Sequence, residues 1–166
     1  MNITKIWPIL FVFTSCTTAP SLISYFFDTG VIQYFFPPTD WAAQGSGAKT
    51  QEKARLDITY RTGTDTPATV NISFFGKNSI PRKMTSIALN GNGVIYPLEN
   101  IVVLYPVPKK RELRITSQGN HDALASVLKT EPITLTAEID GVLYTYTPDK
   151  NFIKIKNDFL TAISYF

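Results

Sequence analysis

An alternation of apolar and polar residues, broken by short turns, limits most strongly what this chain can fold into. Every second residue is apolar from Ile133 to Ile139, and Asp140-Gly141 separates this run from a second one over 142–146. A two-residue period is that of a β-strand with one buried face, and Asp-Gly between two such runs favours a tight hairpin turn. The same alternation over 56–60 and 70–74 predicts another hairpin.

Other segments extend this strand pattern along the chain. We expect strands at 31–36, 84–89, 94–96, 101–105, 113–116 and 152–155. The segment 101–105 is continuously apolar, which predicts burial, and 159–166 is expected as a final strand or a short helix. Between the aromatic stretches 25–27 and 34–36, Asp28-Thr29-Gly30 favours a hairpin turn, with a helix before the strand as the alternative.

One segment outside the amino-terminal leader favours a helix. Leu124, Val127 and Leu128 lie on one helical face over 121–129, and Asn120 can cap the helix start. About nine or ten short strands with one helix between them predict a mainly β fold. We expect a single antiparallel β-sandwich, loosely immunoglobulin-like, with a small β-barrel as the alternative.

Length and composition set the class of protein. The 166 residues amount to one domain, and 44% hydrophobic residues exclude a disordered chain and predict a packed core. With 16 basic and 13 acidic residues the net charge is only +3, so no strong field favours nucleic acid as a partner. The single cysteine, Cys16, excludes an internal disulfide and a thiolate zinc site.

The first sixteen residues have the pattern of an export signal. Lys5 precedes an apolar run over 6–13, which as a helix rises only about 12 Å and is too short to cross a bilayer core of about 30 Å. A basic start, a short apolar centre and small exit residues are typical of a cleaved secretory signal peptide. The exit, Phe13-Thr14-Ser15-Cys16, resembles the lipobox of bacterial lipoproteins in the looser form found in spirochaetes, with Phe for the preferred Leu and Ser for Gly or Ala.

This resemblance implies lipidation and a place in the cell. It implies that Cys16 receives a diacylglyceryl thioether, becomes the new amino terminus after cleavage and carries a further fatty acid such as palmitate. The chain then divides into a signal peptide over 1–15, a lipidated tether over 16–21 and one β-rich domain over 22–166. We expect a lipid-anchored protein of the bacterial envelope, at the outer rather than the inner membrane, with the periplasmic or surface face left open.

Residues that suggest catalysis are few and scattered. His121, the sole histidine, stands beside Asp122 and near Ser117 and Ser126, but no Gly-x-Ser-x-Gly turn presents a nucleophile. We therefore interpret His121 as a surface residue at a helix start. We expect no catalytic residue, no metal and no cofactor. A hydrolase is the remaining enzymatic alternative, using dispersed carboxylates that could meet in space: Asp57, Asp65, Glu99, Glu112 and Glu138.

The aromatic stretch over 25–41 is one candidate binding surface. Neighbouring residues of a strand face opposite sides, so consecutive rings such as Phe35 and Phe36 cannot share one face. One ring can enter the core while another covers a membrane, a partner or a ligand groove. We assign Tyr34, Phe36 and Trp41 to a possible binding surface, with burial of both faces as the alternative.

A basic cluster is the second candidate surface. Lys109, Lys110, Arg111 and Arg114 follow two prolines in an expected loop. They are suited to contact anionic headgroups or an acidic partner, and the alternative is a solvated loop.

Together these features predict a non-catalytic, lipid-anchored envelope lipoprotein. We expect its β-sandwich to serve macromolecular binding or envelope structure, through a protein or envelope-polymer partner, and not nucleic acid. The alternative is a carrier that holds an apolar small molecule or lipid in an aromatic-lined cavity.

Overall fold

The computed structural model describes residues 19–45, 51–63, 67–81 and 83–164. The predicted signal peptide over 1–15 and the predicted lipidation site Cys16 lie outside these described residues.

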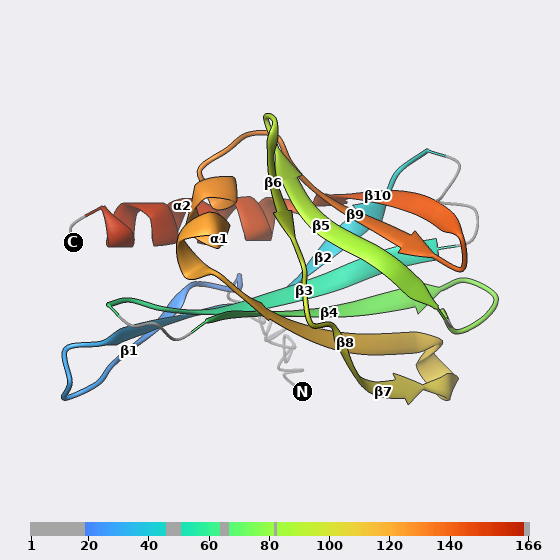
Figure 1. The fold of residues 1–166 in the computed structure, drawn as a ribbon, viewed down its shortest axis with the longest axis horizontal. Coiled ribbons are helices and arrows are strands. Elements are labelled where there is room, and N and C mark those ends of the chain that lie inside the picture. The colour runs from blue at the N-terminus through green and yellow to red at the C-terminus, as the bar shows by residue number, and fades with distance from the viewer. Residues whose placement is uncertain (1–18, 46–50, 64–66, 82, 165–166) are drawn as a thin grey trace, which may run out of the picture.

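The described chain is mainly β, as expected (Figure 1). Its strands are β1 (Ile23–Phe26), β2 (Ile32–Ala43), β3 (Gln51–Arg61), β4 (Ala68–Gly76), β5 (Met84–Gly91), β6 (Val94–Pro97), β7 (Val102–Val107), β8 (Glu112–Gly119), β9 (Ile133–Ile139) and β10 (Val142–Pro148). Two α-helices, α1 (His121–Leu128) and α2 (Lys150–Ile163), and a short 3-10 helix, η2 (Pro108–Lys110), complete it.

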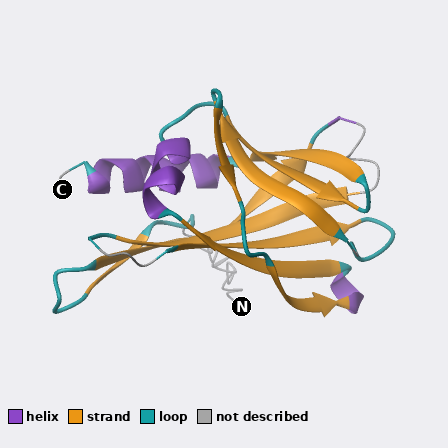
Figure 2. Cartoon of the chain, in the orientation of Figure 1, coloured by secondary structure: helices purple, strands orange, loops and turns teal. Residues whose placement is uncertain are grey.

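The ten strands form one antiparallel sheet with the order β6-β5-β9-β10-β2-β3-β4-β8-β7, and β1 pairs with β2. The sheet folds over on itself at the junction of β10 and β2, where only three residue pairs are made. Its two halves face each other as the layers of a sandwich, with both helices at one side (Figures 1 and 2). Because β6 and β7, at the two ends of the strand order, do not pair with each other, the sheet is not closed, and the barrel alternative is wrong. The layers also differ from the separate sheets of an immunoglobulin domain, since they belong to one sheet.

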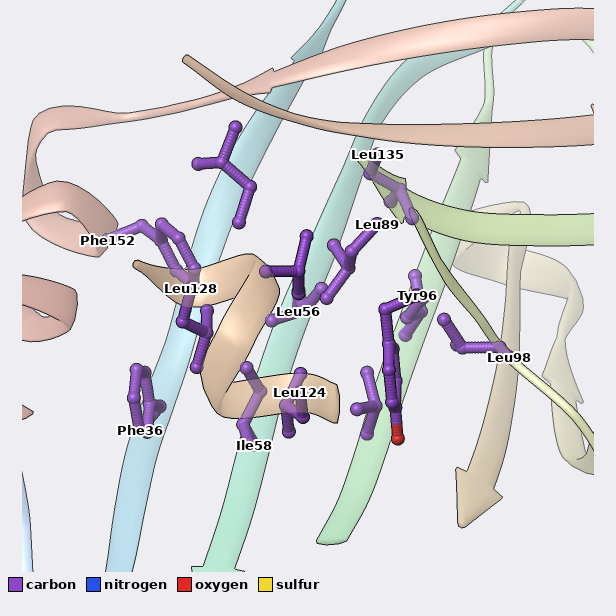
Figure 3. Close-up of a cluster of buried hydrophobic side chains, with 14 of the residues drawn as sticks. Phe36, Leu56, Ile58, Leu89, Tyr96, Leu98, Leu124, Leu128, Leu135 and Phe152 are labelled. Carbon is purple, nitrogen blue, oxygen red and sulfur yellow. The ribbon is translucent and has the colours of Figure 1, made fainter. Parts of the chain in front are cut away.

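The core lies between the two layers. Strand β9 alternates buried and half-buried residues along its whole length, which confirms the predicted period of two. Leu56 and Ile58 of β3 lie across from Leu89 of β5 and Leu135 of β9, and Leu124 of α1 lies beside them (Figure 3). All five side chains are almost fully buried, so both halves of the sheet and the helix contribute to one apolar interior.

Three local predictions are confirmed by hydrogen bonds, backbone angles and strand pairing. Asn120 caps α1, since its Oδ1 accepts a hydrogen bond from the backbone N–H of Ala123 at 2.9 Å. At the β9–β10 turn Asp140 and Gly141 have φ values of 52° and 79°, the left-handed pair that a type I′ hairpin turn needs. The hairpin predicted around 28–30 is also present, because β1 pairs with β2.

The strand expected over 152–155 is wrong, because these residues belong to α2. Asp149 starts this helix by accepting a hydrogen bond from the Phe152 N–H at 2.9 Å. Phe152, Ile155 and Phe159 then follow at helical spacing and are fully buried against the sheet. Because Ile153 is also apolar, the sequence over 152–155 resembles a strand. The cap at Asp149 and the spacing of three and four residues between the buried side chains identify the helix.

Two strands extend beyond their expected ends at 36 and 105 and continue through proline residues. Strand β2 continues through Pro37 and Pro38 to Ala43, because a bulge between Phe36 and Thr39 accommodates the prolines. Strand β7 continues through Pro106, which an edge strand tolerates because half of its backbone groups face away from the sheet.

Candidate docking surface

Strand β7 carries four consecutive exposed apolar residues, distributed over both of its faces, whose exposure sequence reasoning missed. Val102, Val103, Leu104 and Tyr105 are 54%, 54%, 46% and 47% exposed, although the run was predicted to be buried. These four residues are called the β7 surface below. The continuous apolar pattern fits a strand covered on both faces, but β7 lies at the end of the strand order and pairs only with β8 among the described strands.

The free edge of β7 is not suited to long strand addition. A bulge places Leu104 between the pairs Val103–Ile115 and Tyr105–Arg114, and Pro106 lacks an N–H group. Bulges and prolines are devices that prevent edge-to-edge pairing of strands. Contact with another molecule is therefore left chiefly to the side chains of the β7 surface.

A basic turn directly follows the β7 surface. Lys109 and Lys110 belong to η2 and are exposed, and Arg111 ends η2 with a left-handed φ of 51°. The Arg111 N–H donates to the Pro108 carbonyl at 3.0 Å, and its guanidinium donates to the carbonyl of Lys77. Arg111 thus helps to hold the turn, while the two lysines leave their ammonium groups in solvent. Lys109, Lys110 and Arg111 are called the basic turn below.

Arg114 has a different role from Lys109, Lys110 and Arg111. Its Nη2 donates to Asp57 Oδ2 at 2.6 Å and its Nη1 donates to Ser73 Oγ at 3.1 Å. Asn71 donates to the other oxygen of the Asp57 carboxylate at 2.7 Å. The Asp57 side chain is only 4% exposed, so Arg114 neutralises a buried carboxylate within the sheet and does not belong to the basic turn.

The aromatic candidates are core residues. Tyr34, Phe36 and Trp41 are 3%, 1% and 0% exposed, so they do not form the binding surface assigned from the sequence. The reason is α2, since Phe152 packs against Trp41 with ring centroids 4.6 Å apart and Phe159 packs against Phe36 at 5.0 Å. Helix α2, which begins earlier than the short helix considered for 159–166, therefore covers the face of β2 on which these rings lie.

Neither serine considered for catalysis is hydrogen-bonded to His121, and Asp65 lies outside the described residues. His121 Nε2 lies 3.3 Å from Asp122 Oδ1, and its ring packs edge-on against Tyr60 at 5.8 Å. The Ser117 hydroxyl donates to the Glu99 carbonyl, and that of Ser126 donates to the carbonyl one turn earlier in α1. Within 19–45, 51–63, 67–81 and 83–164, no three metal-ligating side chains cluster.

A surface hollow of about 290 Å³ lies between the start of β9, the end of β10 and α2. It is lined by Glu131, Pro132, Ile133, Thr147, Pro148 and Ile153. Ligand pockets have volumes of about 300–1,000 Å³ and are usually rich in aromatic side chains. The rings of the aromatic stretch do not line this hollow, so it does not correspond to the cavity expected for a carrier.

Comparison with protein-family models, with curated proteins and with solved structures finds no match to this chain. In the part of the chain that the structure describes, neither helix has the length and apolar character needed to span a membrane.

Proposed function

We propose that this chain is a non-catalytic, lipid-anchored protein of the bacterial envelope whose domain binds an acidic, partly apolar segment of another protein. The lipobox-like sequence around Cys16 supports the anchor. The observation that carries the binding role is the β7 surface, four consecutive apolar residues about half exposed, with the basic turn next to it along the chain.

The apolar side chains of the β7 surface and the charges of the basic turn indicate which kind of partner would bind. Contiguous exposed apolar side chains are costly in a monomer and mark contact sites. A polysaccharide offers little to aliphatic residues such as Val102 and Val103, whereas a protein segment can bury its own apolar side chains against them. Lys109 and Lys110 add a positive rim, which favours acidic residues in the partner and raises the rate of encounter.

Site-specific photo-crosslinking in intact cells tests the binding role. A benzophenone amino acid at Leu104 is compared with one at Leu143, which is 67% exposed at the start of β10 and serves as the matched apolar control. We expect a discrete adduct from position 104, weakened by Lys109→Glu with Lys110→Glu, and an acidic peptide at the crosslink by mass spectrometry. Equal adducts from both positions, or adducts that the charge reversal leaves unchanged, would contradict the proposal.

Intact-mass analysis of the native protein tests the anchor separately. We expect a mass increase for acyl chains on a protein that begins at Cys16, and release of the Cys16→Ser variant from the membrane fraction. A native chain with a free thiol and its leader still attached would refute the anchor.

A further inference from the structure

The β1 hairpin is the second exposed apolar feature, and it lies at the amino-terminal end of the described chain. Strand β1 is exposed along its whole length, and Tyr25, Phe26 and Phe27 are 52%, 76% and 46% exposed. The turn is well formed, since the Phe27 N–H donates to the Val31 carbonyl and the Gly30 N–H to the Phe27 carbonyl, both at 3.0 Å. Figure 1 shows this hairpin projecting at the lower left, below the helices.

The described chain leaves about half or more of each of these three side chains exposed. Strand β1 pairs only with residues 32–35 of β2, and β10, which pairs along the same edge of β2, contacts it only at 41–43. The hairpin is therefore a two-stranded extension of the sheet beyond its paired body. Such an extension keeps three neighbouring aromatic side chains in solvent, and this costs free energy unless another phase receives them.

The short stretch of chain between the proposed anchor at Cys16 and the hairpin indicates that this phase is the lipid bilayer. Ile23 is the seventh residue after Cys16, and a chain of seven residue steps spans at most about 25 Å when fully extended. An acyl chain on Cys16 therefore keeps the hairpin close to the bilayer. Tyrosine and phenylalanine suit that boundary because their rings are apolar and, in tyrosine, one end is polar.

We propose that the β1 hairpin is a second membrane contact, with Tyr25, Phe26 and Phe27 seated in the headgroup and upper acyl region beside the lipid anchor. This inference rests on the anchor of the proposed function. Residues 22–36 contain no lysine or arginine, so the contact is hydrophobic and does not require anionic lipid or low salt.

The strand register places the basic turn at the far end of the strands from the β1 hairpin. Thr59, which pairs with Phe35 beside the hairpin, also pairs with Thr69, and Thr69 pairs with Gln118 near the end of β8. The basic turn precedes Glu112, at the start of β8. Gln118 lies six residue steps along β8 from Glu112, or about 20 Å. A membrane-bound hairpin therefore directs the basic turn away from that bilayer and leaves it free for a protein.

Fluorescence quenching tests the membrane contact. The processed protein, purified from membranes, is reconstituted in vesicles of neutral phosphatidylcholine with or without brominated acyl chains. Phe26→Trp is compared with Ile95→Trp, a matched position 65% exposed in the β5–β6 hairpin. Trp41 is fully buried and gives the same background in both variants. We expect severalfold stronger quenching for Phe26→Trp than for Ile95→Trp, unchanged by added salt.

Intact mass of the same samples separates the two proposals. An acylated protein whose Phe26→Trp emission is quenched no more than that of Ile95→Trp overturns the hairpin contact and leaves the anchor standing. An unmodified thiol overturns the anchor, and with it the premise that chain length holds the hairpin at the membrane. Quenching that disappears at high salt overturns the hydrophobic contact, because an electrostatic one would then be responsible.

Discussion

Replacing Arg114 with alanine tests the assignment of this residue to the interior of the sheet. The guanidinium contacts the Asp57 carboxylate at 2.6 Å, and the Arg114 side chain is 19% exposed while that of Asp57 is 4% exposed. Removing one partner of a buried ion pair costs about 3–5 kcal/mol, because the other charge is left without compensation. Asn71 still donates to the carboxylate, and water can reach the vacated position, so the lower end applies. We expect a loss of about 3 kcal/mol in the free energy of unfolding.

Urea unfolding followed by Trp41 fluorescence measures this loss, since Trp41 is fully buried in the native fold. With a denaturant slope of about 2 kcal/mol per molar, the unfolding midpoint falls by about 1.5 M. Lys110→Ala is the control, and its exposed position predicts a change within about 0.5 kcal/mol. Asp57→Asn in the Arg114→Ala background should recover part of the loss. A loss within about 0.5 kcal/mol, no larger than that of the lysine control, would refute the structural role of Arg114.

Three further changes test the core and one exposed ion pair. Phe152→Ala should lower the free energy of unfolding by about 4 kcal/mol, because a fully buried ring is lost, and a urea midpoint near that of the unchanged protein would contradict this. Tyr146→Phe should raise the free energy of unfolding by about 1 kcal/mol, because the Tyr146 hydroxyl is buried and has no hydrogen-bond partner among the described residues. The same burial raises the pKa of this tyrosine. A loss of stability in the variant would show that the hydroxyl has a partner. Burial alone raises the pKa of Asp40, but hydrogen bonds from Arg55 and Lys53 bring it below its ordinary value of 3.8. Its contribution to stability is therefore present above that pH and lost as the pH falls below it, so unfolding midpoints measured across this range should fall less steeply for Asp40→Asn.

The strands with one buried face could be predicted from the sequence, because their alternating pattern is local. Alternation over 133–139 and the Asp140-Gly141 turn predict β9, β10 and their hairpin directly. The exposure of β7 was not accessible in this way, since a continuous apolar run at 101–105 has the same appearance whether the strand lies at the centre or at the edge of a sheet. Position in the strand order is set by long-range pairing, which periodicity does not report.

The candidate site was predicted in part for the same reason. Lys109 and Lys110 were identified correctly as exposed charges, because a basic cluster after two prolines marks a turn. Arg114 follows them closely in sequence, but strand geometry turns it towards Asp57, more than fifty residues away along the chain. Whether Tyr34 and Phe36 are buried depends on α2, and their burial follows only once residues 150–163 are recognised as a helix.

The position of α2 in the chain determines when the interior can close during folding. Phe152 and Phe159 complete the packing around rings of β2, yet they follow every described strand in the order of synthesis. A nascent chain that lacks them leaves one side of its sheet uncovered, however many strands it has made. Among the described elements, the last one to be synthesised is therefore the one that completes the hydrophobic interior against the rings of β2.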